Sequence, residues 1–347
     1  MIKEAISLIS NQQNLTERQA AEAVGDIISG AATDVEIAAF LSGLRAKGET
    51  ASEISGGVKA LRSHAVQIKP NVESSIDIVG TGGDQSGTFN ISSAAALVTA
   101  AAGACVAKHG NRSVSSQSGS ADVFEKLGLD IHIDAAAACR CLEQNHFAFL
   151  YAPYYHPAMK HAAPVRRALG IRTLFNLLGP LANPTAVDAM LLGVCSAALS
   201  EDMARALSSI GVKRALVVNS HDHTDEISLA APTSVIEIRN GEKQVYVIKP
   251  DDYGLTCCTL EDLKGGKPEI NAKLIETVFN GRTGPVRDVI ALNAGAALYL
   301  ADKASSIKDG IGLALKTISS GRAADFLGTI RQKHQQSSDQ QKAGAMI

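Results

Sequence analysis

The sequence predicts an α/β protein with a small all-helical N-terminal domain, and two patterns indicate this class. Residues 1–66 contain three helix-start signals, each followed by apolar residues at helical spacing. From residue 72 to residue 332, short apolar runs alternate with alanine-rich helical stretches. That alternation is typical of a largely parallel sheet with helices on its faces. We therefore expect a helical domain over residues 1–66 and an α/β domain over residues 72–332.

The helix-start signals of the N-terminal domain pair a threonine with an acid or amide three residues later. They are Thr16 with Gln19, Thr33 with Glu36 and Thr50 with Glu53. In such a capping box each side chain bonds the backbone N–H group of the other residue, so that the first turn of the helix is closed. Gly30 and Gly48 stand where helices are expected to stop. Pro70 prevents the last helix from continuing through the connector, residues 64–71.

The strands of the second domain are predicted from short apolar runs. These runs are Ile76–Val79, Cys105–Lys108, Phe147–Tyr151, Ala189–Val194 and Ala215–Asn219. We expect the segment 157–184 to pack near the helical domain and the hinge between the two domains. Residues 333–347 are polar and aperiodic, so we expect a disordered tail.

Composition restricts the kind of partner. A net charge of −2 and 4% aromatic residues provide neither a basic stripe nor many stacking platforms, so we expect no nucleic-acid partner. The longest nearly uninterrupted apolar stretch, Ala94–Ala107, is shorter than the ~20 residues of a membrane span. Residues 1–14 lack the apolar core of an export signal, so we expect a cytoplasmic protein. The six cysteines form no C-x-x-C pair and are expected to be buried thiols. We expect a small-molecule partner.

The stretch VGTGGDQSGTFNISS, residues 79–93, follows the first predicted strand and leads into a helix that we expect to begin near Ser92 or Ser93. Backbone N–H groups at such a loop form an anion site. The P-loop pattern fails because Thr88 stands at its lysine position, and the dinucleotide pattern fails at Gln85. A tight turn without ligand remains an alternative. Asp84 favours a metal-chelated sugar phosphate, because a carboxylate in an anion site needs a cation or a sugar hydroxyl nearby.

The stretch KHGNRSVSSQSGSAD, residues 108–122, follows the second predicted strand and is expected to form another wall of the same site. Lys108 can place a point charge on phosphate, Asn111 can donate and accept, and the serines add hydroxyl groups. The composition also suits a solvated loop. A single histidine at a strand end, such as His109, is more often packed than catalytic.

The stretch HDHTDEIS, residues 221–228, follows the last predicted strand. We do not expect zinc at His221 and His223, because the loop has no further Cys or His ligands. Asp225 and Glu226 suit Mg²⁺ better, since that ion takes one or two carboxylates together with phosphate oxygens and water. A solvated acidic turn is the alternative.

Five motifs resemble the anthranilate phosphoribosyltransferase family. They are GTGGD at 80–84, FNISS at 89–93, KHGNRSVSS at 108–116, HPAMKHAAPVRRALGIRTLFNLLGPLANP at 156–184 and DEIS at 225–228. Residues 29–50 also resemble the opening domain of that family. The resemblance covers nearly the whole chain. It implies the nucleoside-phosphorylase-like (class II type) phosphoribosyltransferase fold and a homodimer joined through the helical domain.

The resemblance implies transfer of the 5-phosphoribosyl group from phosphoribosyl pyrophosphate (PRPP) to the amino group of anthranilate, a step toward tryptophan. It also implies two Mg²⁺ ions with bound PRPP, one held by Ser92 and the other by Asp225 and Glu226. The catalytic residues that it implies are Lys108, Arg166, Asp225 and Glu226. The contacts to anthranilate that it implies are Gly80, Asn111, His156 and Arg166, with Arg166 facing the carboxylate. The contacts to PRPP that it implies are Gly80, Gly83, Asp84, Thr88, Asn90, Ile91, Ser92, Ser93, Lys108, His109, Gly110, Asn111, Arg112, Ser113, Val114, Ser115, Ser116 and Ser120.

Two other functions stay open on the sequence alone. A pyrimidine nucleoside phosphorylase shares the fold and a similar Lys and Ser phosphate site, but it does not need the Asp225–Glu226 pair for magnesium. A non-catalytic nucleic-acid-binding relative could keep the same fold. The near-neutral charge and the intact GTGGD and DE motifs argue against this second alternative.

Overall fold

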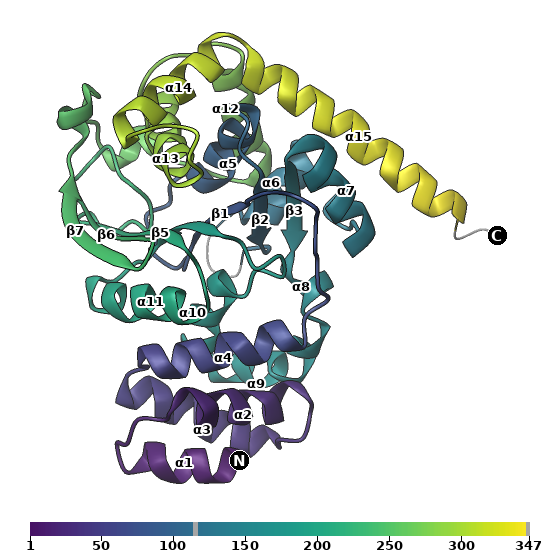
Figure 1. Ribbon diagram of the computed structural model, residues 1–347, viewed down its shortest axis with the longest axis vertical. Coiled ribbons are helices and arrows are strands. Elements are labelled where there is room, and N and C mark those ends of the chain that lie inside the picture. Colours follow the sequence, from purple (N-terminus) through teal and green to yellow (C-terminus); the bar gives the residue numbers. More distant parts are fainter. Residues whose placement is uncertain (114–116, 345–347) are drawn as a thin grey trace.

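A seven-stranded sheet forms the centre of the molecule, and helices cover both of its faces (Figure 1). The computed structural model describes residues 1–113 and 117–344. The strands are β1 Ile76–Gly80, β2 Val106–Gly110, β3 Phe147–Tyr151, β4 Ala189–Gly193, β5 Arg214–Ser220, β6 Thr233–Arg239 and β7 Glu242–Ile248. Their order is β3-β2-β1-β4-β5-β6-β7, with β1 to β5 parallel and β6 and β7 antiparallel. The prediction of a largely parallel sheet is confirmed.

The hairpin of β6 and β7 is the part of the sheet that the apolar runs did not predict. Its turn residues Asn240 and Gly241 both have positive φ, +52° and +85°. A two-residue hairpin turn needs this backbone, and Asn-Gly between two β-rich segments is the sequence signal for it. β7 forms the edge of the sheet, and most of its side chains are exposed, including Val245 and Val247 of its apolar run VYVI, residues 245–248.

The N-terminal domain is a group of four helices that lies below the sheet in Figure 1. The helices are α1 Ile2–Ser10, α2 Glu17–Ile28, α3 Asp34–Lys47 and α4 Ala51–Ser63. The three predicted capping boxes are all present, at the starts of α2, α3 and α4. Gly48, with a φ of +91°, directly follows the last residue of α3, as predicted.

Glu53 is the buried ionic centre of this domain. Its side chain is fully buried, and the Nζ of Lys47, whose side chain is only 4% exposed, lies 3.0 Å from Glu53 Oε2. The same oxygen accepts hydrogen bonds from the backbone N–H and the hydroxyl of Thr50, and Oε1 accepts one from the N–H of Leu15. The carboxylate therefore closes the first turn of α4 and holds it to the loop between α1 and α2.

We expect Glu53→Ala to lower the free energy of unfolding by about 3–5 kcal/mol, because it leaves the buried ammonium group of Lys47 without its carboxylate. Glu22→Ala is the matched control. It breaks an ion pair with Arg18 in which the side chains are 38% and 76% exposed, and such pairs contribute about 0.5 kcal/mol. Urea unfolding followed by circular dichroism measures both variants. Equal midpoints would contradict the role that we assign to Glu53.

Each face of the sheet is covered by its own hydrophobic cluster. On one face lie α5 Ile91–Ala101, α6 Ser120–Lys126, α12 Pro268–Phe279, α13 Pro285–Leu300, α14 Ile307–Ser319 and α15 Arg322–Gly344. On the other face lie α7 Ala135–Asn145, α8 Ala152–Tyr155, α9 Ala163–Leu169, α10 Leu174–Leu181 and α11 Ala197–Ser209, together with the N-terminal domain. The 3₁₀ helices are η1 Pro157–His161, η2 Pro250–Tyr253 and η3 Leu260–Leu263. Within the segment 157–184, η1, α9 and α10 contact α2, α3 and α4.

The C-terminal segment differs from the sequence expectation. We expected disorder from residue 333, but α15 continues to Gly344 and projects away from the body of the molecule (Figure 1). The start of this helix is anchored, because Ala323, Leu327 and Ile330 are buried. An anchored helix extends at little cost, and Gln, the most frequent residue after position 333, is a good helix former. Residues 345–347 lie outside the described residues. Over the ranges described, no helix has the length and apolarity that crossing a membrane requires.

The chain leaves the carboxyl ends of β1 and β4 toward opposite faces of the sheet. After β1 it enters α5, which belongs to one hydrophobic cluster, and after β4 it enters α11, which belongs to the other. When the connections after two neighbouring parallel strands go to opposite faces of the sheet, a crevice forms between them, and ligands of open α/β sheets bind there. The loops after β1, β2 and β5 all begin at this edge.

Candidate active site

Three segments that are far apart in the sequence meet at this edge: the glycine loop (residues 80–90), β2 and the acidic pair Asp225 and Glu226. The backbone N–H of Gly82 donates to Asp225 Oδ2 at 2.6 Å. The backbone N–H of Ser92, in the first turn of α5, donates to Glu226 Oε1 at 3.1 Å. Lys108, on β2, places its Nζ 3.4 Å from Ser92 Oγ. The three segments therefore form one site.

Gly80 and Gly193 leave room for the acidic pair. They are neighbours at the ends of β1 and β4. A Cβ atom on Gly80 would collide with the carboxylate of Asp225, and a Cβ atom on Gly193 would collide with the backbone carbonyl of the same residue. Gly193 is a site residue that the sequence analysis missed. The available signal was a glycine at the end of a buried apolar strand, where close backbone approach is one of the usual reasons for glycine.

The buried acidic pair does not ionise as readily as ordinary carboxyl groups. Burial, followed by the charge of Asp84, raises the pKa of Asp225 to about 7. Burial, followed by the charge of Asp225, raises the pKa of Glu226 to about 8. Burial also lowers the pKa of Lys108, although Asp77 and the acidic pair oppose this shift. A cation beside these carboxylates would relieve their repulsion and favour their charged forms.

The donor atoms of this site suit a magnesium ion that the substrate helps to hold. Within residues 1–113 and 117–333, no group of three or more His, Cys, Asp or Glu side chains could hold a metal ion alone. Two buried carboxylates near the hydroxyl of Ser92 form a partial oxygen set, and Mg²⁺ takes its remaining ligands from phosphate oxygens and water. His221 is occupied elsewhere, since its Nε2 shares a hydrogen bond with Ser234 Oγ at 2.9 Å.

The glycine loop has a backbone that glycine adopts most easily. Gly82, Gly83 and Gly87 have φ values of +67°, +74° and +70°, and Gln85 is also positive at +57°. The helix after the loop, α5, begins at Ile91, one residue before the predicted start. The loop therefore ends at a helix N-terminus, and the N–H of its second residue already bonds the acidic pair.

The family resemblance implies that PRPP binds at this loop, and we therefore expect Gly83→Val to lower kcat/KM for PRPP by about 10²-fold and to change the KM for anthranilate much less. A residue with a side chain at position 83 would be strained by the positive φ, and its Cβ would lie 2.9 Å from Arg172 Nη1. Gly211→Val is the matched control, because Gly211 has a φ of +87° but an open neighbourhood. Steady-state kinetics with each substrate varied measures both variants. Equal weakening of both substrates by Gly83→Val would indicate general misfolding instead.

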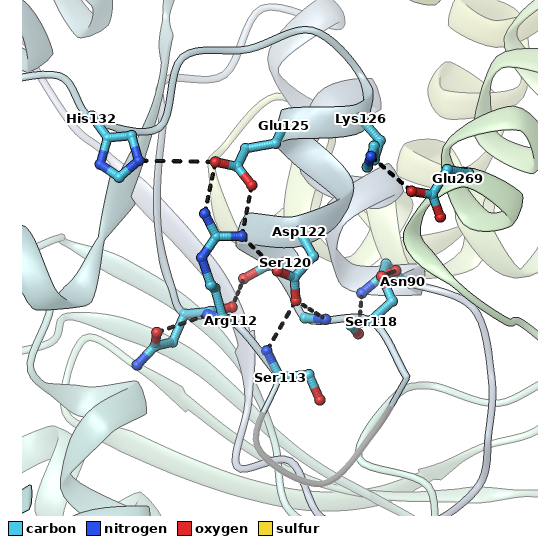
Figure 2. A network of polar contacts seen from close by, with 12 residues as sticks. Asn90, Arg112, Ser113, Ser118, Ser120, Asp122, Glu125, Lys126, His132 and Glu269 are labelled. Atoms are coloured by element: carbon cyan, nitrogen blue, oxygen red, sulfur yellow. Dashed lines mark hydrogen bonds and ion pairs between the residues drawn. The ribbon is translucent and has the colours of Figure 1, made fainter.

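Figure 2 shows how the described parts of the basic loop, residues 111–113 and 117–119, are fixed to α6. Arg112 Nη1 donates to Asp122 Oδ1 at 2.8 Å and to Glu125 Oε2 at 2.6 Å, and its Nη2 donates to Glu125 Oε1 at 2.7 Å. Asp122 also accepts hydrogen bonds from the N–H groups of Ser113 and Gly119. The guanidinium of Arg112 is thus engaged with α6, and a ligand would meet the backbone of this residue more readily than its side chain.

The ends of the basic loop are also held. Ser118 Oγ donates to Asn90 Oδ1 at 2.9 Å, which links this loop to the glycine loop (Figure 2). Ser120 Oγ donates to the carbonyl oxygen of Asn111 at 3.3 Å, while the side chain of Asn111 is exposed. Three residues that the resemblance assigns to PRPP, Val114, Ser115 and Ser116, lie outside the described residues.

Arg166, on α9, is a half-buried arginine stacked on an aromatic ring. Its guanidinium carbon lies 5.4 Å from the ring centroid of Phe175, and burial lowers its pKa. In the part of the chain that the structure describes, no carboxylate forms an ion pair with Arg166, and no hydrogen bond joins it to Gly80 or Asn111. The neighbouring Arg167 is exposed. Arg166 can therefore donate hydrogen bonds to the carboxylate of a ligand from a fixed position on Phe175, whereas Arg167 points into solvent.

His109 and His156 form a buried pair of neutral rings. Their ring centroids are 5.2 Å apart. Burial lowers the pKa of His156 to about 4 and holds the pKa of His109 well below its usual value. His109 is packed, as predicted, and its backbone N–H donates to Asp77 Oδ1 at 3.3 Å. A ring with a pKa near 4 is a weak base at pH 7, so His156 serves better as a wall than as a base.

Two family models match the chain, and together they cover almost all of it. The model described as "Glycosyl transferase family, helical bundle domain" matches residues 3–65. The model described as "Glycosyl transferase family, a/b domain" matches residues 72–324. The division of the chain in these matches coincides with the change from helices to alternating strands and helices.

Three known proteins show how close the similarity is. The chain is 49% identical over 327 residues to an anthranilate phosphoribosyltransferase of Acetivibrio thermocellus, covering 94% of this chain and 95% of that protein. It superposes on the crystal structure of the Thermus thermophilus anthranilate phosphoribosyltransferase with a TM-score of 0.91 and 41% identity, covering 95% and 99% of the two chains. The Saccharomyces cerevisiae enzyme, solved in complex with PRPP and Mg, gives a TM-score of 0.88 with 27% identity, covering 96% and 98%.

Proposed function

The chain belongs to the anthranilate phosphoribosyltransferase family, and from this premise we infer that it transfers the 5-phosphoribosyl group of PRPP to the amino group of anthranilate. The products are N-(5-phosphoribosyl)anthranilate and pyrophosphate, and the reaction is a step of tryptophan biosynthesis. One observation carries this function on the chain itself. The glycine loop, Lys108 and the acidic pair meet at one crevice of the sheet, linked by the hydrogen bonds of Gly82 and Ser92.

The chemistry of the transfer explains why such a crevice suffices. The bond from the ribose C1 atom to the pyrophosphate oxygen breaks, and its electron pair leaves with pyrophosphate. Positive charge develops on the sugar and negative charge on the leaving group, so the site must stabilise charge and align the two substrates. The amino nitrogen of anthranilate then bonds to C1 and loses a proton. An arylamine is neutral and nucleophilic at pH 7, so the reaction needs neither a covalent nucleophile nor a strong base.

We assign the donor side of the site to the glycine loop, Lys108 and the acidic pair. Backbone N–H groups of the loop bind phosphate oxygens, since Gly82 and Gly83 allow the backbone to approach them closely. The ammonium group of Lys108 neutralises the pyrophosphate. Magnesium, when bound, neutralises charge on the pyrophosphate. Asp225 and Glu226 hold one ion and the Ser92 hydroxyl holds the other; the buried, mutually repelling carboxylates of the acidic pair support this assignment.

We assign the acceptor side to Arg166, with Gly80, Asn111 and His156 around the aromatic ring of anthranilate. Arg166 presents a guanidinium that stacks on Phe175 and has no carboxylate partner among the described residues. Its planar fork can bind the anthranilate carboxylate through two parallel charge-assisted hydrogen bonds. His156 is neutral at pH 7 and 6% exposed, which suits an uncharged wall beside the ring.

The experiment that tests this function follows the loss of anthranilate fluorescence by the purified protein. We expect turnover with PRPP, anthranilate and Mg²⁺ present, and none when any one of them is omitted. A nucleoside phosphorylase would instead cleave thymidine with inorganic phosphate and leave anthranilate unchanged. Both assays use the same preparation, so they distinguish the two candidate activities directly.

We also propose that the enzyme acts as a homodimer joined through the helical domain and works in the cytoplasm. The family supports the dimer, and Val35, on α3, provides an apolar side chain that is 79% exposed on this domain. Light scattering should give the mass of two chains. Val35→Glu should shift the monomer–dimer equilibrium toward the monomer. Cell fractionation tests the location.

A further inference from the structure

Arg172 is a guanidinium near the crevice to which the reaction described above gives no role. It precedes α10, in the segment that connects the sheet with the helical domain, and it is half-buried. Its Nη1 donates to the sulfur of Cys195 at 2.9 Å, and its Nη2 is buried without any hydrogen-bond partner. A thiol sulfur is a weak acceptor. Most of the hydrogen-bonding capacity of this buried cation is therefore unused.

Arg214 and Arg239 also each have one buried guanidinium nitrogen without a hydrogen-bond partner, but both of these arginines form an ion pair with Asp302. Arg62, on α4, donates from Nε and Nη2 to the carbonyl oxygen of Leu181, at 3.1 and 2.7 Å. An arginine with a purely structural role is normally satisfied in this way, because an unpaired buried N–H group is unfavourable. Among the side chains of residues 1–113 and 117–333, Arg172 forms no ion pair with a carboxylate. Its free donor group thus indicates an acceptor that arrives from outside the chain.

The position of Arg172 identifies where that acceptor binds. A Cβ atom on Gly83 would lie 2.9 Å from Arg172 Nη1, so the guanidinium borders the open side of the glycine loop. Its anchor Cys195 lies two residues after the end of β4, and the N–H of Cys195 donates to Thr81 Oγ1 at 3.4 Å. Arg172 is thus held between the loop after β1 and the loop after β4, at the crevice where the strands diverge.

We propose that Arg172 is a further substrate-binding residue, which donates hydrogen bonds to a phosphate oxygen of PRPP bound over Gly83. This inference rests on the proposed function. An oxyanion is the ligand that a guanidinium fork recognises best. A phosphate of the donor is favoured over the carboxylate of the acceptor because the neighbour of Arg172 is Gly83, which belongs to the glycine loop assigned to the donor side. Arg172 adds a second cation to the phosphate site, on a different element from Lys108.

The test measures binding of PRPP in the presence of Mg²⁺ by calorimetry, and the KM of each substrate, for the wild type, Arg172→Gln and Arg172→Lys. We expect Arg172→Gln to raise the Kd and KM for PRPP about ten- to a hundredfold, with a change of less than about twofold in the KM for anthranilate. Arg172→Lys should recover only part of the affinity, because an ammonium group keeps the charge and loses the fork.

Cys195→Ala is the control for a structural role. It removes the anchor of Arg172 and leaves the guanidinium, so we expect a change of less than about threefold in PRPP affinity. The inference is overturned if Cys195→Ala and Arg172→Gln weaken PRPP equally, or if Arg172→Gln leaves the Kd for PRPP unchanged. It is also overturned if Arg172→Gln raises only the KM for anthranilate, which would place the acceptor carboxylate there. A wild type that binds PRPP but does not consume anthranilate would contradict the proposed function and not the role of Arg172.

Discussion

Replacing Asp225 and Glu226 together by alanine is expected to lower kcat by about 10³-fold while the protein remains folded. Both carboxylates are buried, and burial is the largest cause of their raised pKa values. Their removal deletes an unfavourable buried charge, so the fold should survive, but the site loses its ligands for the cation that neutralises pyrophosphate. Initial rates over a magnesium titration, together with circular dichroism, measure the two effects separately.

The chain offers a matched control in Asp251 and Asp252. These are also adjacent acidic residues, but they lie exposed on η2. The Asp251→Ala/Asp252→Ala variant should keep wild-type kinetics and the wild-type dependence on magnesium. Full activity of the Asp225→Ala/Glu226→Ala variant, with unchanged magnesium dependence, would refute the assignment of the acidic pair.

Arg166→Ala is expected to raise the KM for anthranilate about ten- to a hundredfold, because a charge-assisted contact of this kind contributes about 1.5–3 kcal/mol. PRPP binding should change little. Arg166 is half-buried and stacked on Phe175, whereas Arg167, the next residue, is exposed. Arg167→Ala should therefore leave the KM for anthranilate unchanged, and Arg166→Lys should restore only part of the affinity. Steady-state kinetics with anthranilate varied measures all three variants.

Two outcomes would show that the acceptor side is placed wrongly. The first is an Arg166→Ala variant with wild-type anthranilate kinetics. The second is an Arg167→Ala variant with the same loss as Arg166→Ala, because that result would indicate a general effect of charge on α9 and not a specific contact.

The features that the sequence predicts well are those determined by short-range chemistry. The capping boxes of α2, α3 and α4 depend on residues three positions apart, and all three are present. The parallel strands are buried, so each appears as a short apolar run. The β6–β7 hairpin was missed, although the Asn240–Gly241 turn and the apolar run at residues 245–248 were signals for it. α15 extends into the polar tail because polar composition does not exclude a helix that begins on a packed turn.

The features that the sequence could not predict depend on contacts between distant segments. Gly193 is required because the backbone of Asp225 passes over it. Arg172 lies inside the family motif at residues 156–184, but only the structure shows that its Nη2 lacks an acceptor and that it borders Gly83. Arg112 resembled a ligand-binding residue, while its guanidinium is engaged by Asp122 and Glu125, an arrangement that becomes visible once α6 is in place. Tertiary proximity supplied each of these facts.

A crystal structure of this protein with PRPP, Mg²⁺ and an unreactive anthranilate analogue would test the central claim most directly. The account predicts pyrophosphate against the glycine loop within hydrogen-bond distance of Lys108, and magnesium at Asp225 and Glu226. It also predicts the carboxylate of the analogue at Arg166. PRPP bound away from the carboxyl edge of β1 and β4, or a liganded crevice in which neither Asp225 nor Glu226 contacts a metal ion, would contradict it.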